Sequence, residues 1–248
     1  MSGPADSRMP AAVAAATARW ARLTWQAGDP ARLAERLAAR LGLQPEALAT
    51  GAWRLDLGGE ALDVVPWLRE GPRDDPSPEG RLMLEPIPGG GPVPVGDAGA
   101  RLALVGIAWS AVELDRAEAE LDPWLAPPDT AQGDGDAATD PHLGARTRRR
   151  RTGALPGGTL VLAEPGTEGR LAASLARDGE GPCALYLAAS AGLDAWVAEA
   201  RARGVRVSAR RPGPLGPAVL LPGAAVAGPH LIIVGPPATG ASASTIAP

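Results

Sequence analysis

The chain has 248 residues, is 45% hydrophobic and carries a formal net charge of -4, values typical of a soluble globular protein with one large or two small domains. It contains no Phe, Lys or Asn, so all 24 basic residues are arginines, a bias that indicates a GC-rich bacterial genome. The lack of lysine excludes a Schiff base and a P-loop lysine. The single cysteine, Cys183, excludes an intrachain disulfide and a zinc site made of several thiolates.

The acidic balance argues against nucleic acid as a partner, and no stretch approaches the ~20 apolar residues of a membrane span. Residues 1–19 are rich in alanine but too weakly apolar for a signal peptide, so we expect a disordered tail. We therefore expect a cytoplasmic protein. A second disordered tail is expected at 236–248.

Three segments repeat one order of signals, a strand, an amphipathic helix and further strands. In the first, residues 22–27 alternate between polar and apolar. Asp29 and Pro30 begin a helix that Gly42 ends, and Leu33, Leu37 and Leu41 form its apolar stripe. Strands are expected to follow at 52–57, 61–65 and 81–86.

The second and third units show the same order. The second has a strand at 102–109, a helix at 113–125 and strands at 144–151 and 159–163. The third has a strand at 184–188, a helix at 193–203 and strands at 205–209, 218–221 and 231–234. We therefore predict an α+β protein of paired βαβββ modules whose curved, cup-shaped mixed sheet spans 101–235, with an N-terminal module at 20–88 and a linker at 89–100.

The run Thr159-Leu-Val-Leu-Ala-Glu-Pro, the segment that begins Glu168-Gly-Arg-Leu and ends Gly-Glu-Gly181, and Ala184-Leu-Tyr-Leu resemble the vicinal oxygen chelate superfamily. That superfamily includes glyoxalase I, extradiol dioxygenases, bleomycin-resistance proteins and methylmalonyl-CoA epimerase. The epimerase-like branch shares the order strand, Glu-Pro, helical turn and Gly-Glu-Gly. The resemblance implies a cup that holds a divalent metal on His, Gln and Glu side chains.

Aliphatic side chains stand where the resemblance places those metal ligands. The matching positions in the second and third modules are Leu104, Val161, Ala184 and Ile233, none of which can ligate a metal. Cys183 and His230 lie next to such positions, but neighbouring strand residues point to opposite faces. We therefore expect no metal and no cofactor, a state with precedent in the bleomycin-resistance proteins of the superfamily.

Strand alternation then predicts what lines the cup instead. The predicted lining is apolar with one hydroxyl, and this suggests either a pocket for an apolar or aromatic ligand oriented by Tyr186 or a filled core. The expected cup-facing residues are Leu104, Gly106, Ala108, Val161, Ala163, Ala184, Tyr186 and Ile233.

The corresponding face of the first module is polar. It is expected to present Arg22, Thr24 and Gln26 from the first strand and Asp63 from a later one, with Arg54 and Asp56 between them. This set suits a carboxylate-bearing or hydroxylated ligand, although a solvated sheet face explains it as well.

Two further features have alternatives. The arginines within 146–151 could bind the phosphates of a coenzyme A thioester or a nucleic-acid backbone, but on an edge strand they more often prevent aggregation. Cys183 and His230 could form a nucleophile and base only if the fold brought them together; a lone buried cysteine is far more often inert.

The function expected from these observations is metal-independent binding of a small apolar or aromatic molecule by a homodimer. The candidate ligand-binding residues are Tyr186, Leu104, Ala108, Val161, Ala184, Ile233, Arg22, Gln26 and Asp63. The alternative is an isomerase or lyase related to methylmalonyl-CoA epimerase or glyoxalase that uses another acid or base, with Asp63 and Glu164 as candidates. The N-terminal module is left without a module to pair with, and we expect it to dock across the dimer interface or to cap the edge of the cup.

Overall fold

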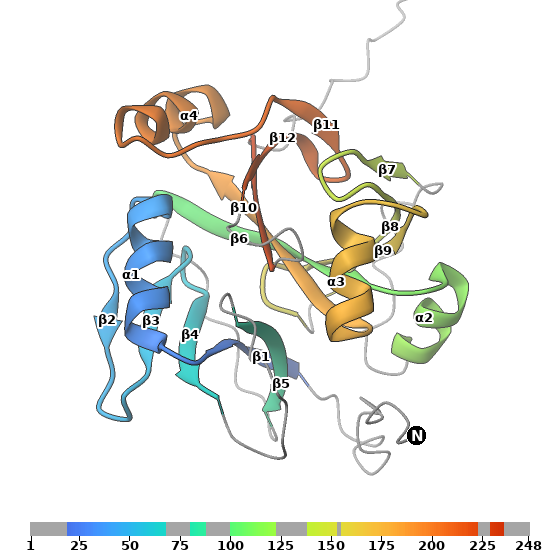
Figure 1. The fold of residues 1–248 in the computed structure, drawn as a ribbon, viewed down its shortest axis with the longest axis horizontal. Helices are drawn as coiled ribbons and strands as arrows, with labels where there is room; N and C mark the ends of the chain where they lie inside the picture. Colours follow the sequence, from blue (N-terminus) through green and yellow to red (C-terminus); the bar gives the residue numbers. More distant parts are fainter. Residues whose placement is uncertain are drawn as a thin grey trace, which may run out of the picture.

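A computed structural model describes residues 19–67, 80–87, 100–122, 138–152, 155–222 and 229–235 (Figure 1). None of the described helices is long and apolar enough to cross a membrane. The elements, in chain order, are β1 (Arg19–Ala27), α1 (Pro30–Leu41), β2 (Glu46–Ala47), β3 (Trp53–Asp56), β4 (Ala61–Pro66), β5 (Arg81–Ile87), β6 (Leu102–Ser110), α2 (Leu114–Leu121), β7 (Ala138–Asp140), β8 (Ala145–Arg151), β9 (Thr159–Pro165), α3 (Arg170–Asp178), β10 (Gly181–Ala189), α4 (Leu193–Ala202), β11 (Arg211–Gly213), β12 (Gly216–Leu221) and β13 (His230–Val234).

The C-terminal part forms an eight-stranded sheet in the order β11-β12-β13-β10-β6-β9-β8-β7. Each half is one βαβββ module, in which the first strand lies parallel beside the last: β6 beside β9, and β10 beside β13. The two modules join through antiparallel pairing of β6 with β10. This strand order confirms the predicted α+β fold of paired βαβββ modules in a curved mixed sheet.

The N-terminal part forms a separate five-stranded sheet in the order β2-β3-β4-β1-β5. Strands β1 to β4 and helix α1 reproduce the module, because β4 is the strand that pairs in parallel with β1. Strand β5 pairs antiparallel with β1, as β6 does with β10. The prediction that 81–86 ends the first module is therefore wrong: β5 occupies the position that the first strand of a further module would take.

Helix α1 follows its sequence signals closely. The Asp29 carboxylate accepts a 3.0 Å hydrogen bond from the backbone N–H of Arg32, and Gly42 ends the helix in the left-handed conformation with φ of 74°. The apolar stripe Leu33, Leu37 and Leu41 is buried. The helix thereby covers one face of the five-stranded sheet with leucine side chains.

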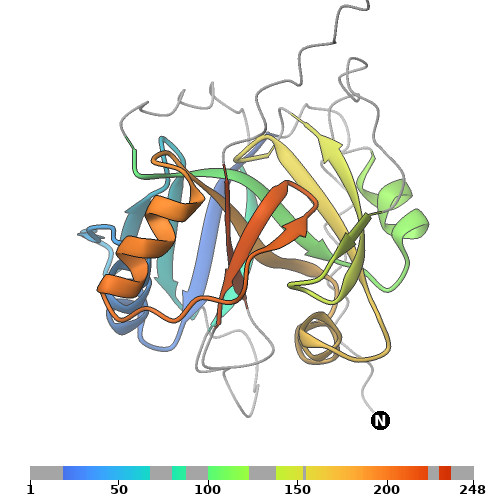
Figure 2. The ribbon, with the colours of Figure 1, turned by 90° about the horizontal axis from the view of Figure 1, so that it is seen from above.

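One hydrophobic core joins the two sheets. It contains Leu23 and Trp25 of β1, the buried face of α1, and the side chains of β6, β10 and α4 that point away from the cup. The N-terminal module thus packs on the outer surface of the cup within the same chain, with α1 and α4 on the same side of the molecule (Figures 1 and 2). At the junction the Leu104 N–H donates to the Leu57 carbonyl at 2.9 Å.

Three local features differ from the expectations. Helix α3 lies between the modules, where only a helical turn is implied by the resemblance; Leu171 and Ser174 are its buried residues. The strand expected at 205–209 is not formed. Of this segment, Ser208 bonds to Leu220 of β12, and strand β11 begins only at Arg211. Strand β7 is an addition to the strands expected for the second module.

Candidate functional site

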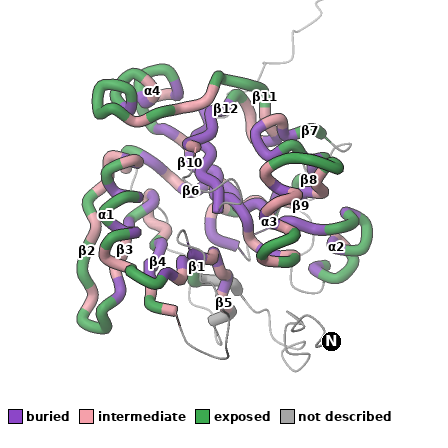
Figure 3. The backbone as a smooth tube through the Cα atoms, viewed as in Figure 1, coloured by how far each residue is buried: buried purple, intermediate pink, exposed green. Residues whose placement is uncertain are grey.

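The concave face of the eight-stranded sheet carries its own hydrophobic cluster, and we call this cluster the cup interior. Five of the predicted cup residues lie in it and are fully buried: Ala108, Val161, Ala163, Ala184 and Tyr186. Figure 3 shows that the central strands of this sheet are buried along most of their length. The complete cluster is Ala108, Leu143, Ala145, Val161, Ala163, Leu171, Cys183, Ala184, Tyr186, Ala218, Leu220, Ile232 and Val234.

Leu104 and Ile233 were expected in this set, but their side chains lie in the core on the other face of the sheet. The register between β6 and β10 shifts at Val105, so alternation is interrupted between Gly106 and Leu104. In β13, Ile232 lies opposite Tyr186 and Ile233 lies opposite Leu187, so Ile232 faces the cup and Ile233 does not. The prediction that Leu104 and Ile233 face the cup is therefore wrong.

The same two effects place Cys183 and His230 on the cup side, contrary to the expectation from alternation. A register shift between Pro182 and Ala184 leaves Cys183 as an extra residue, and its side chain joins the cup interior beside Ala184. The Cys183 Sγ atom lies 3.5 Å from the Ala108 carbonyl oxygen. Burial raises the pKa of this thiol to about 12, so it is a poor nucleophile.

Contacts between distant strands close the cup. The edge strands β7 and β11 touch one another, and His142 Nε2, in the turn after β7, lies 3.0 Å from the Ala218 carbonyl oxygen of β12. Leu215, in the turn between β11 and β12, packs against Gly106 of β6. A Cβ atom added at Gly106 would lie only 2.8 Å from Leu215 Cδ1. The sheet therefore curls into a nearly closed barrel around the cup interior.

The hydroxyl of Tyr186 forms a hydrogen bond inside this barrel. The phenol donates a 2.6 Å hydrogen bond to Asp140 Oδ2, and both residues are completely buried. Burial, together with the Asp140 carboxylate, raises the pKa of Tyr186 well above its ordinary value. The Asp140 Oδ1 atom accepts from the backbone N–H groups of His142 and Leu143. The polar groups beside Tyr186 thus bind one another.

His230 differs from these hydrogen-bonded polar groups of the cup. Its side chain is buried, and neither ring nitrogen has a hydrogen-bond partner among the described residues. Burial, together with the positive charges of Arg170 and Arg177 on α3, lowers the pKa of His230 to about 4. The imidazole is therefore neutral at pH 7.

The described residues contain no group of three or more His, Cys, Asp or Glu side chains arranged to hold a metal ion. The cup interior itself consists mostly of alanine, valine, leucine and isoleucine side chains, which cannot bind a metal. The donor set of the cup therefore does not fit a metal centre.

The polar face of the five-stranded sheet brings together three of the expected residues. Asp63, whose side chain is 3% exposed, accepts from Arg54 Nε at 2.7 Å and from Arg22 Nε at 3.3 Å. Thr24 donates to Glu85 on the neighbouring strand β5 at 3.4 Å. Gln26 lies opposite Arg81. Arg54 also donates from Nη2 to the second oxygen of Asp63 at 3.1 Å, so the two side chains form a bidentate pair. This pairing raises the pKa of Arg54.

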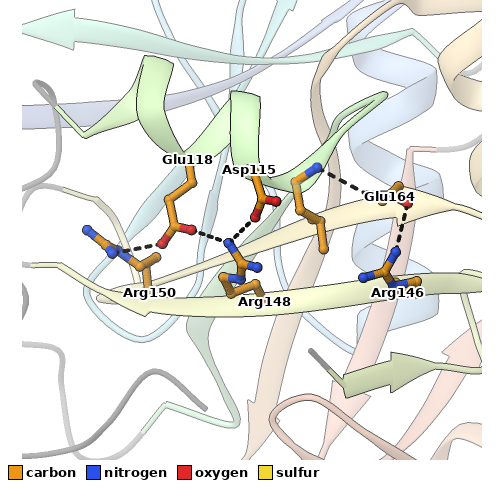
Figure 4. A network of polar contacts seen from close by, with 7 residues as sticks. Asp115, Glu118, Arg146, Arg148, Arg150 and Glu164 are labelled. Carbon is orange, nitrogen blue, oxygen red and sulfur yellow. Dashed lines mark hydrogen bonds and ion pairs between the residues drawn. The ribbon is translucent and has the colours of Figure 1, made fainter. Parts of the chain in front are cut away.

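The arginine run on β8 forms a network with helix α2 (Figure 4). Arg148 and Arg150 both bind Glu118, Arg148 also binds Asp115, and Arg150 also binds Asp122. Arg146 binds Glu164, whose second oxygen accepts from the backbone N–H of Leu114 at 3.2 Å. The other arginines of the run, Arg149 and Arg151, are exposed. Three of the five arginines therefore join β8 to neighbouring elements.

A groove of about 380 Å³ lies where α1 meets the ends of β12 and β13. Nothing in the sequence singled it out, because its walls come from segments almost 200 residues apart. Its base is apolar and includes Trp25, and its charged residues are all arginines. The lining residues are Trp25, Leu33, Arg36, Leu37, Ala39, Arg40, Arg206, Leu221, Pro222, Pro229 and Leu231.

Comparison with known proteins found no matching family model and no matching curated protein. Several solved structures are similar. A variant of Streptomyces coelicolor methylmalonyl-CoA epimerase in complex with 2-nitronate-propionyl-CoA is 21% identical, with a TM-score of 0.39 over 53% of this chain and 96% of that one. The Mycobacterium tuberculosis methylmalonyl-CoA epimerase is 20% identical, with a TM-score of 0.42 over 54% and 88%.

A variant of 4-hydroxymandelate synthase from Streptomyces coelicolor covers more of the chain. It is 16% identical, with a TM-score of 0.40 over 89% of this chain and 71% of that one. The strand order defines the fold independently of these similarities. Two βαβββ modules joined through their first strands form the curved sheet of the vicinal oxygen chelate fold.

Proposed function

We propose that this chain binds a small molecule with an apolar or aromatic body, that it does so without a metal, and that the ligand occupies the groove between α1 and the β12–β13 edge. The groove carries the proposal. Its volume of about 380 Å³ lies within the range of roughly 300–1,000 Å³ that is usual for ligand sites. Trp25, Leu33, Leu37, Leu221 and Leu231 offer it an aromatic and aliphatic wall.

The packing of the cup interior favours the groove, rather than the cup, as the binding site. Tyr186, which was expected to orient a ligand there, already donates its hydroxyl to Asp140, and the alanine and valine side chains around it are packed and buried. A ligand in the cup would have to displace these side chains, whereas the groove is open space.

The alternative of an isomerase or lyase receives no support from its two candidate acid–base residues. Two arginines bind Asp63, and Glu164 binds Arg146 and the first N–H of α2. Carboxylates held in this way stabilise the fold and are poorly placed to exchange protons with a substrate.

The proposal is tested with N-phenyl-1-naphthylamine, an uncharged aromatic probe whose fluorescence rises on entering an apolar site. We expect saturable binding that a chelator leaves unchanged. Ala39→Trp places a large ring on the exposed wall of the groove and should weaken binding about tenfold or more. Ala119→Trp, on the exposed face of α2, is the matched control. Binding that is lost with chelator, or unaffected by Ala39→Trp, contradicts the proposal.

A further inference from the structure

The geometry points to a narrower ligand class, an organic anion whose acidic group is bound by Arg36, Arg40 and Arg206 while its apolar body lies against Trp25 and the leucines. This inference rests on the groove being the ligand site. It adds the charge of the ligand, which the apolar wall alone does not specify.

The three guanidinium groups approach from two walls. Arg36 and Arg40 are four residues apart on α1, so their side chains leave the helix on the same face. Arg206 comes from the segment after α4, on the side of β12 and β13. An acidic group at the mouth of the groove would therefore meet arginines from α1 and from the facing segment.

Arg40 is held in place at the groove. Its Nη2 donates a 2.6 Å hydrogen bond to the carbonyl oxygen of Pro222, which lines the opposite wall. Arg203, which donates to the Arg40 carbonyl at 3.5 Å, also pairs with Glu199. These bonds give Arg40 and Arg203 a structural role at the C-terminal end of α1.

Arg206 has no such role within the described part of the chain. It is exposed, and no hydrogen bond or ion pair holds it there. None of the described residues that line the groove is acidic. Guanidinium groups bind carboxylates, sulfonates and phosphates through paired N–H donors, and such charge-assisted bonds are about twice as strong as neutral ones.

Two probes that share one aromatic body separate this inference from the proposed function. N-phenyl-1-naphthylamine is uncharged, and 8-anilinonaphthalene-1-sulfonate carries a sulfonate on the same framework. We expect the sulfonate to bind about tenfold more tightly at low salt and to lose most of that advantage at 1 M NaCl. Equal binding overturns the inference and leaves the proposed function standing; failure of both probes overturns both.

The variant that discriminates is Arg206→Gln. We expect it to reduce the preference for the sulfonate several-fold and to leave the affinity for the uncharged probe unchanged. Arg151→Gln, which removes the same charge from an exposed position on β8, should leave both affinities unchanged. Equal losses in the two variants would show a general effect of net charge and would overturn the inference. Unfolding curves of both variants confirm that the probes report the folded protein.

Decanoate and decyl phosphate, as competitors of the sulfonate probe, distinguish a carboxylate from a phosphate ligand. Decanol is their uncharged control and should compete at least tenfold less well. Competition by decanol as strong as that by both anions overturns the inference.

Discussion

The hydroxyl of Tyr186 lies 2.6 Å from Oδ2 of Asp140, in a part of the barrel where neither residue is exposed to solvent. The second carboxylate oxygen of Asp140 accepts from the backbone of the turn that follows β7. One buried carboxylate thus connects the central strand β10 to the edge of the sheet. The pair explains how a tyrosine can be buried in a cup that is otherwise apolar.

Tyr186→Phe should destabilise the protein by about 1–3 kcal/mol, because it leaves one lone pair of a buried carboxylate without its partner. Urea unfolding monitored by tryptophan fluorescence measures the loss. Ser190→Ala, which removes an exposed hydroxyl bonded to the Arg101 carbonyl, should cost no more than about 0.5 kcal/mol. Equal costs for the two variants would show that the Tyr186–Asp140 bond does not contribute.

The Cys183 thiol should resist thiol reagents in the native protein. It is buried, and its pKa is raised to about 12, so very little thiolate exists at pH 8. We expect the thiol-specific reagent DTNB to react at once in 6 M guanidinium chloride and only on the timescale of unfolding without it. Ala195→Cys, an exposed position on α4, is the control that should react rapidly in both conditions. Rapid labelling of native Cys183 would contradict its placement in the cup interior.

His230 should make the fold sensitive to mild acid. Its pKa in the folded protein is about 4, below the ordinary value of 6.5, so the unfolded chain binds the proton more tightly. Stability from the neutral imidazole is fully present above pH 6.5 and is lost as the pH falls from 6.5 towards 4, by up to about 3 kcal/mol. Comparing unfolding of the wild type and His230→Leu between pH 4 and 8 isolates this effect, because the other titrating groups are shared.

His230→Leu should also be more stable than the wild type at pH 5, since it removes two buried nitrogens that have no hydrogen-bond partner in the described part of the chain. A constant difference between the two proteins across this pH range would mean that His230 titrates normally in the folded state.

Local signals predicted the elements well and their faces less well. Asp29, the leucine stripe and Gly42 all lie within one helix, and they specified α1 because capping and amphipathicity act over a few residues. The face of Leu104 depends on an irregularity at Val105, and the face of Ile233 on the register of β13 against β10. Neither is encoded within the strand concerned, because both arise from its pairing with another strand.

The groove was hidden from sequence analysis for a related reason. Arg36 and Arg40 look like the solvated face of an amphipathic helix until packing places Pro222 and Arg206 across from them. The polar set Arg22, Arg54 and Asp63 was foreseeable, because alternation and one hairpin bring it together within a single module. Residues that meet within one module were predictable, whereas the groove, whose walls come from different modules, was not.

The network between β8 and α2 predicts an unequal response to removing its carboxylates. Glu118 is 18% exposed and binds both Arg148 and Arg150, whereas Asp115 is 78% exposed and binds only Arg148. Glu118→Gln should therefore cost about 1 kcal/mol or more of unfolding free energy, and Asp115→Asn about 0.5 kcal/mol or less, because water screens an exposed ion pair. Urea unfolding at 20 mM and 1 M NaCl measures both, and high salt should reduce the smaller cost further. If the two substitutions cost the same, β8 and α2 are held together by their apolar contacts, and the arginines of β8 contribute only surface charge.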